Sequence, residues 1–366
     1  MIPTPHLLSL ATAVPPYRLR QADVVAFARR LFAERPREDL ERLLPVYANA
    51  GIETRYSCVP LEWYEQDHGW AEKNDLYVRH ALDLSEQATR ACLERAALGV
   101  EAIDAIVVAS TSGIATPSLD ARLAERLPLR RDVTRLPIFG LGCAGGVLGL
   151  ARAAALAQAM PGAKVLFVVV ELCGLTFRRR DQSKSNVIAS ALFGDGAAAA
   201  LVSCAGARAN PRARQIMRPY RGEGPRLAAW GEHTWPASLD VMGWRVEDDG
   251  LGVLFSRDIP TIVRDGFRPA LDGFLARHGL ALADIDHFLC HPGGAKVIAA
   301  LEEAVGVQQG GLALARAVLK DFGNMSAATV LFVLDQALAN GAMRGRSLLS
   351  AVGPGFSAGF MILEAA

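Results

Sequence analysis

The chain has 366 residues, 51% hydrophobic and 21% charged, enough to bury one large core or two ordinary ones. Its 39 lysines and arginines balance 38 acidic residues and are scattered, which argues against a nucleic-acid partner. The apolar runs fall short of the roughly 20 residues of a membrane span, and residues 1–10 lack a signal-peptide pattern. We therefore expect a cytoplasmic protein without membrane insertion.

Runs typical of strands alternate with runs typical of helices, an order that predicts sheets covered by helices. In chain order we expect a helix over 83–97, a strand over 105–110, a helix over 144–160, strands over 164–170, 197–203 and 287–290, helices over 295–305 and 326–339, and strands over 347–352 and 358–364.

Two patterns recur about 180 residues apart, which indicates an internal duplication. Ile103-Asp104, ahead of an apolar run, is repeated by Ile285-Asp286. Gly142-Cys143, ahead of an Ala-rich run, is echoed by Gly323-Asn324. We expect two α/β halves, residues 1–210 and 211–366, divided within a stretch rich in Pro, Gly and Arg. The duplication would place Cys143 and Asn324 at equivalent helix starts that share one site.

Cys143, His291 and Asn324 form the candidate catalytic set. A thiolate attacks a carbonyl, an imidazole manages the proton, and an amide donates to the oxyanion. The positive end of a helix, and an imidazole within hydrogen-bond reach, would favour the thiolate of Cys143. Gly142, Gly145 and Gly146 suit a tight turn that an acyl chain can approach.

Structural explanations exist for each signal taken singly. A lone buried cysteine is most often a core residue, and an asparagine at a helix start is most often a cap. We assign the core role to Cys58, Cys92, Cys204 and Cys290. The cysteines and histidines show no metal-ligand spacing, and no phosphate-binding glycine loop of the P-loop type occurs, so we expect no metal and no bound cofactor.

The motifs together are specific enough to compare with a known family. They are Thr111-Ser112-Gly113 with Pro117, Gly142-Cys143-Ala144-Gly145-Gly146, Thr176-Phe177-Arg178, residues 191–199 (ALFGDGAAA), His291-Pro292-Gly293-Gly294, Gly323-Asn324-Met325-Ser326 and Gly353-Pro354-Gly355. Over nearly its whole length the chain resembles the type III polyketide synthases, the chalcone synthase-like branch of the thiolase-fold condensing enzymes.

This resemblance implies an α/β protein, a homodimer of five-layered α/β/α/β/α subunits. It implies that Cys143 carries the starter acyl group and the growing chain as thioesters, while His291 and Asn324 serve the decarboxylation of malonyl-CoA. Phe193 matches the family's gatekeeper aromatic. Coenzyme A carries the substrates, so no bound cofactor is implied. The implied substrate contacts are Thr111, Thr116, Cys173, Thr176, Phe193, Val253, Ser326, Gly353, Pro354, Gly355 and Arg42.

Several positions depart from the plant members of that family. Val253 stands where they place a second gatekeeper phenylalanine, so a longer acyl chain could pass. Thr116 replaces a methionine that reaches across the dimer, and Cys173 replaces a threonine of the cavity wall. Of three basic residues that contact coenzyme A, only Arg42 is matched. Residues 183–186 and 235–244 resemble bacterial members that make alkylpyrones or alkylresorcinols from fatty acyl starters.

Three alternatives remain open. A ketoacyl synthase III-like enzyme shares the Cys-His-Asn set but makes one condensation onto a carrier protein; His291-Pro292-Gly293-Gly294 speaks against it, because that relative usually has His-Gln-Ala-Asn. A papain-like hydrolase also combines Cys, His and Asn, but would not show the duplication. A thiolase-fold protein could instead bind acyl-CoA without turnover, since fold alone does not secure activity.

Overall fold

A mixed sheet of nine strands runs through the computed structural model, which describes residues 3–204, 224–341 and 343–365. Its order is β5-β4-β6-β7-β1-β8-β13-β12-β11. The strands are β1 (Pro5–Ala13), β4 (Ala105–Ala109), β5 (Thr134–Ile138), β6 (Lys164–Leu172), β7 (Asp195–Cys204), β8 (Arg226–Thr234), β11 (His287–Cys290), β12 (Gly345–Gly353) and β13 (Ser357–Ala365). One residue pair, His6 with Arg226, joins β1 to β8, so the sheet divides there into two parts.

The two parts of the sheet repeat each other. In the first, β4 is parallel to β6, β6 antiparallel to β7, and β7 antiparallel to β1; β11, β12, β13 and β8 follow the same scheme. The Asp104 side chain accepts from the backbone N–H of Lys164, and Asp286 accepts in the same way from Arg346. The duplication predicted from these aspartates is confirmed.

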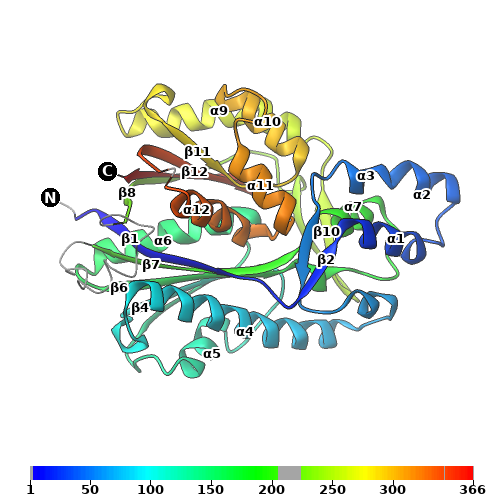
Figure 1. Ribbon diagram of the computed structural model, residues 1–366, viewed down its shortest axis with the longest axis horizontal. Helices are drawn as coiled ribbons and strands as arrows, with labels where there is room; N and C mark the ends of the chain where they lie inside the picture. The colour runs from blue at the N-terminus through cyan, green and yellow to red at the C-terminus, as the bar shows by residue number, and fades with distance from the viewer. Residues whose placement is uncertain (1–2, 205–223, 342, 366) are drawn as a thin grey trace.

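Helices complete five layers, which Figure 1 shows edge-on. α4 and α5 cover the outer face of the first part of the sheet, which contains β1, β4, β5, β6 and β7. α6 and α12 lie between the two parts, and α9 and α10 cover the outer face of the second part. The helices are α1 (Gln21–Leu31), α2 (Arg37–Leu43), α3 (Pro45–Ala48), α4 (Trp70–Ala96), α5 (Leu119–Arg126), α6 (Gly145–Ala159), α7 (Lys184–Leu192), α9 (Ile259–Arg277), α10 (Ala295–Val305), α11 (Ala313–Phe322) and α12 (Thr329–Ala339). The predicted α/β/α/β/α layering is confirmed.

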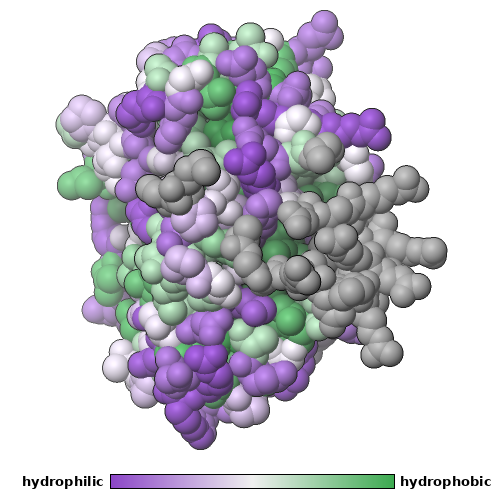
Figure 2. Space-filling view, turned by 90° about the vertical axis from the view of Figure 1, so that its left-hand side faces the viewer, coloured by the Kyte–Doolittle hydropathy of each residue, from purple (hydrophilic) through white to green (hydrophobic). Residues whose placement is uncertain are grey.

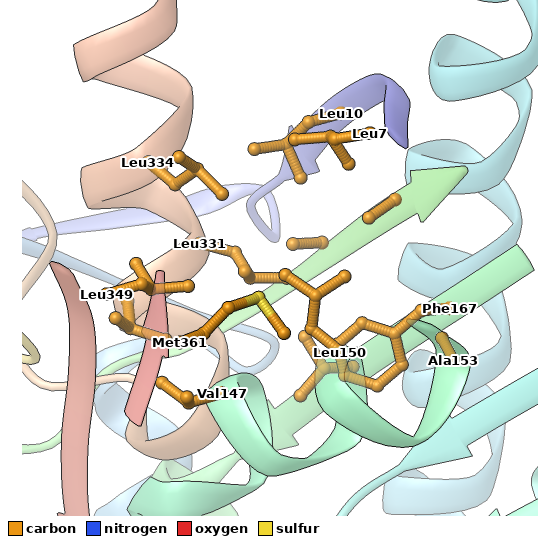
Figure 3. Close-up of a cluster of buried hydrophobic side chains, with 14 of the residues drawn as sticks. Leu7, Leu10, Val147, Leu150, Ala153, Phe167, Leu331, Leu334, Leu349 and Met361 are labelled. Carbon is orange, nitrogen blue, oxygen red and sulfur yellow. The ribbon is translucent and has the colours of Figure 1, made fainter. Parts of the chain in front are cut away.

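The middle layer is apolar around almost its whole circumference because a sheet faces it on each side. Figure 3 shows leucines of α6 and α12 meeting side chains of both sheets, among them Phe167 of β6 and Met361 of β13. A Cβ on Gly149 of α6 would lie 2.4 Å from the Phe167 ring, so the glycine allows the close approach. Burying each such leucine contributes about 1.5–3 kcal/mol. This packing fixes the start of α6.

The strand runs expected from the sequence all form, but three helix starts differ. α4 begins at Trp70, ahead of the expected residue 83, because its polar first turns hide their periodicity. α6 and α12 are each preceded by a 3-10 turn, Gly142–Ala144 and Ser326–Ala328. Gly142 and Ser326 both have φ +46°, so Ala327, not Asn324, is the equivalent of Cys143. The expected equivalence of Cys143 and Asn324 is therefore wrong, because the residue equivalent to Cys143 lies further along the chain, at Ala327.

The expected boundary near residue 210 lies outside the described residues. Two small antiparallel sheets stand apart from the main sheet. One pairs β2 (Tyr17–Arg20) with β3 (Thr54–Ser57), and the other is the hairpin of β9 (Met242–Glu247) and β10 (Gly250–Phe255). On the face shown in Figure 2, the most hydrophilic residues gather toward the two ends, over the outer helix layers. Within the part of the chain that the structure describes, no helix has the length and apolar character to cross a bilayer.

Candidate active site

Cys143 lies in the 3-10 turn that leads into α6, held from behind by the loop after β12. Gly142 has φ +46°, and a Cβ there would lie 2.5 Å from Pro354, so the turn requires glycine for both reasons. Gly353 also packs closely against this turn. Gly355 lies two residues further along the same loop. The Cys143 Sγ is 3.5 Å from the Ser326 Oγ, the side chain that opens the other central turn.

Asn324 is fixed at both ends of its side chain. Its Oδ1 accepts from the Ser326 N–H at 2.8 Å, and its Nδ2 donates to the Gly293 carbonyl at 3.1 Å. Its backbone pairs with the segment around Phe193, because Gly194 N–H donates to Asn324 O and Asn324 N–H to Leu192 O. The carboxamide is therefore oriented before any substrate arrives.

His291 follows β11, and its N–H continues the ladder to the Ser350 carbonyl. The residue is 1% exposed, and neither ring nitrogen has a hydrogen-bond partner among the described residues. Gly293, which accepts from Asn324, also donates its N–H to the His291 carbonyl. Contacts thus run from the Cys143 sulfur through Ser326, Asn324 and Gly293 to the His291 carbonyl, and the three predicted residues lie in one buried cluster of neighbouring segments.

Burial governs the electrostatics of this cluster. It raises the pKa of the Cys143 thiol to about 11, despite the hydrogen bond from Ser326. It lowers the pKa of His291 to about 3, so the imidazole is neutral at physiological pH. The sequence favoured a thiolate through a helix start and a bonded imidazole. In this structure the sulfur contacts Ser326 instead of an imidazole, and its removal from water acts against the anion.

Four of the expected substrate contacts, Cys173, Thr176, Phe193 and Val253, line a single apolar pocket. It lies among α1, α3, α7 and the two small sheets. Its wall also includes Leu19, Val24, Phe27, Ala28, Leu31, Tyr47, Arg55, Tyr56, Ser57, Leu61, Tyr64, Gly174, Phe177, Asn186, Ala189, Ser190 and Leu251. Phe193 thus faces an apolar chamber through its side chain while its backbone pairs with Asn324.

The remaining expected contacts divide into two groups. Thr111 is buried beside the turn that carries Cys143, where its Oγ1 accepts from the Gly142 N–H at 3.2 Å. Thr116 and Arg42 are exposed and lie outside the cluster and the pocket. Arg42 bonds Asp39 on the surface of α2.

Comparison with known proteins gives this arrangement a family. Models of the N-terminal and C-terminal domains of chalcone and stilbene synthases match residues 4–206 and 228–365. A Bacillus subtilis protein, provisionally named a chalcone synthase, is 40% identical over 98% of this chain and 98% of its own length. A 1,3,6,8-tetrahydroxynaphthalene synthase of Streptomyces peucetius is 39% identical over 96% of this chain and 91% of its own.

The chain belongs to the chalcone and stilbene synthase family. The crystal structure of the 1,3,6,8-tetrahydroxynaphthalene synthase of Streptomyces coelicolor, described as a bacterial type III polyketide synthase, matches with a TM-score of 0.89 and 28% identity, covering 99% of this chain and all of that one. The resemblance stated from the motifs is confirmed. The protein is a type III polyketide synthase, an acyltransferase-type condensing enzyme.

Val253 does not leave an open gap in this synthase. It pairs with Trp244 across the β9–β10 hairpin, and the Phe193 ring lies 5.9 Å from Trp244 and 5.7 Å from Phe255. Neighbouring aromatic rings therefore surround the position where plant members place a phenylalanine. Val253, Trp244 and Phe255 all lie on one face of this hairpin, and that face packs against Phe193.

Glu171 is a buried group of this synthase that sequence reasoning missed. It is 1% exposed near the end of β6, and one carboxylate oxygen accepts from the Thr111 N–H at 3.1 Å. Burial raises its pKa to about 7, and its charge raises the pKa of Cys143. The available signal was a single glutamate that follows six apolar residues in the strand KVLFVVVEL.

Replacing Glu171 with glutamine should stabilise the synthase selectively above neutral pH. The folded-state pKa of Glu171 exceeds its ordinary value of 4.5, so wild type loses stability as pH rises toward 7. Relative to wild type, E171Q should gain on the order of 2–3 kcal/mol in unfolding free energy between pH 5 and pH 8. Urea unfolding at both pH values measures it.

The matched control is Glu302, which is also buried but accepts hydrogen bonds from Arg316. Burial raises the pKa of Glu302, but Arg316 and other donors outweigh it, so this pKa lies below its ordinary value. That carboxylate stays ionised at both pH values, so E302Q should differ from wild type by the same amount at each. A pH-independent difference for E171Q would contradict the assigned titration.

Proposed function

We propose that this synthase loads a long-chain fatty acyl group from coenzyme A onto Cys143, extends it with malonyl-CoA, and closes the product to an alkylpyrone or alkylresorcinol. The observation that carries the proposal is the apolar pocket behind Phe193, whose wall is built largely of aliphatic and aromatic side chains. A chamber of this kind gains free energy from an alkyl chain, about 0.8 kcal/mol for each buried CH₂ group.

The three groups of the cluster suit the chemistry of decarboxylative condensation. Cys143 takes the acyl group, and its proton leaves with the coenzyme A thiol. The malonyl thioester oxygen accepts hydrogen bonds from neutral His291 and from Asn324. Carbon dioxide leaves, the electron pair forms an enolate, and the enolate carbon attacks the acyl carbon as the bond to the sulfur breaks. Buried Phe193 provides an apolar wall that favours neutral carbon dioxide over the carboxylate.

A second copy of the chain is proposed as the partner. Near Thr116, the apolar side chains of Ile114, Leu136 and Phe139 are 49%, 37% and 62% exposed, and Leu136 belongs to β5, which ends the sheet. Covering this surface would let Thr116 contact the neighbouring subunit. The extents of the two family models support the division into halves 1–210 and 211–366.

Two further assignments stay proposals. Arg42 would contact the phosphates of coenzyme A, after exchanging its bond with Asp39 for a phosphate oxygen. A cytoplasmic location would keep the Cys143 thiol reduced, as the family's chemistry requires.

Replacing Val253 with phenylalanine should shift starter preference toward short acyl chains. The added ring would fill the pocket mouth beside Phe193 and Trp244, where Val253 now packs. We expect the ratio of kcat/KM for long over short starters to fall at least about tenfold. Val246→Phe is the matched control, because it places the same ring on the same hairpin at a residue that is 78% exposed. An unchanged ratio in V253F would remove the support for a gate at this position.

The proposed function is tested by incubating the purified protein with malonyl-CoA and a series of acyl-CoA starters. Mass spectrometry of the products reports starter, number of extensions and cyclisation together. Alkylpyrones or alkylresorcinols, most abundant with long starters, are expected. A product formed from malonyl-CoA without any acyl-CoA starter, or the tetrahydroxynaphthalene named for the Streptomyces relatives, would overturn the starter assignment.

A further inference from the structure

A buried arginine lies beneath the two segments that carry Phe193 and Asn324. Arg55, in β3, is 3% exposed and donates from Nη1 to the Phe193 carbonyl at 2.9 Å. A Cβ on Gly194 would lie 3.3 Å from its Cβ, and one on Gly323 only 3.1 Å. Arg55 therefore packs against both of the segments whose backbones pair at Phe193 and Asn324.

A second buried residue holds the guanidinium in place. Gln21, at the start of α1, accepts from Arg55 Nη2 at 2.8 Å and donates from Nε2 to the carbonyls of Tyr47 and Ala191. These bonds join α1, α3 and the end of α7, three walls of the apolar pocket, to the Phe193 turn. The network thus spans the pocket and the Phe193 turn that pairs with Asn324.

The energetics of Arg55 favour a positioning role over a purely stabilising one. Burial lowers its pKa to about 10, and its Nε has no hydrogen-bond partner among the described residues. The charge of Asp195 acts in the opposite direction and raises this pKa. Burying a cation with an unsatisfied donor costs folding free energy, whereas a neutral donor would be enough to bond the Phe193 carbonyl. The charge at this place is therefore not explained by stability alone.

Resting on the proposed function, we propose that Arg55 is a positioning residue: with Gln21, it fixes the Phe193 ring at the pocket mouth and the Asn324 amide at the malonyl carbonyl. The planar guanidinium donates in two directions at once. A lysine ammonium at the same place is a single point and cannot hold both acceptors in their present positions.

The test compares Arg55→Lys with the matched change Arg346→Lys. Arg346 lies at the start of β12, where it donates to Glu364 and to the Asp284 carbonyl, whereas the site adjoins the other end of that strand. Alkylation of Cys143 counts intact sites, so each rate is given per active site. In R55K, malonyl-CoA decarboxylation should fall roughly tenfold, and the long-over-short starter ratio should change at least threefold. R346K should change neither.

Gln21→Met keeps the length of the side chain but removes the acceptor of Nη2, so it should shift both readouts in the same direction by less. Q21M also tests the inference if R55K does not fold. The inference is overturned if folded R55K or Q21M keeps wild-type decarboxylation and starter ratio per intact site, which would mean a structural role alone. Wild-type product formation separately tests the proposed function, so the two failures are distinguishable.

Discussion

Replacing Cys143 with alanine should abolish product formation while leaving malonyl-CoA decarboxylation largely intact. Without the sulfur no acyl thioester forms, and loss of such a nucleophile lowers turnover by at least about a thousandfold. Decarboxylation should persist because His291 and Asn324 remain, and Asn324 keeps its bonds to Gly293 and Ser326. Radiolabelled malonyl-CoA measures carbon dioxide release and product in one reaction.

Cys92→Ala is the control for the loss of a buried thiol. Cys92 lies in α4, is fully buried and contacts Ser9, far along the chain from the cluster. C92A should form product at the wild-type rate per folded molecule. Product formation by C143A would refute the role of Cys143 as acyl carrier.

Replacing Asn324 with aspartate should have the opposite effect: malonyl-CoA decarboxylation is lost, but the acylation of Cys143 remains. The carboxylate can still accept from the Ser326 N–H, but it can no longer donate to the Gly293 carbonyl or to the thioester oxygen, and a negative charge replaces the donor. Removal of one oxyanion donor costs about 100- to 1000-fold in rate. We expect N324D to lose carbon dioxide release by this factor while Cys143 is still acylated.

His291→Leu tests the second donor and separates function from stability. The wild-type imidazole is buried with both nitrogens unpaired among the described residues, so an apolar side chain of similar volume should be tolerated well. H291L should unfold at the same or higher urea concentration yet lose decarboxylation. Rapid decarboxylation by either N324D or H291L would show that the thioester oxygen is held elsewhere.

Local patterns made much of this site predictable from sequence. Cys143 follows glycines and precedes an Ala/Leu-rich run, so its place at a helix start follows from turn chemistry and hydrophobic periodicity. The aspartates Asp104 and Asp286 marked the duplication because each caps the neighbouring strand of its own sheet. The five layers then follow from packing the apolar faces of two such halves together.

What escaped prediction depends on contacts between distant segments. Arg55 bonds Phe193 and Gln21, and Glu171 bonds Thr111; no short sequence pattern records these pairings. The effect of burial on the pKa of Cys143 was not visible in the sequence for the same reason, because the helix start is local whereas the burial comes from both halves. Tertiary packing, not motif spacing, decides such properties.

Intact-protein mass spectrometry after brief incubation with a long-chain acyl-CoA tests the central claim most directly. The protein should gain the mass of one acyl group, located by peptide mapping on the fragment that contains Cys143, and should lose it when malonyl-CoA is added and product appears. C143A should gain nothing. Turnover without this intermediate, or an acyl group that forms on another residue and is consumed by malonyl-CoA, would contradict the account.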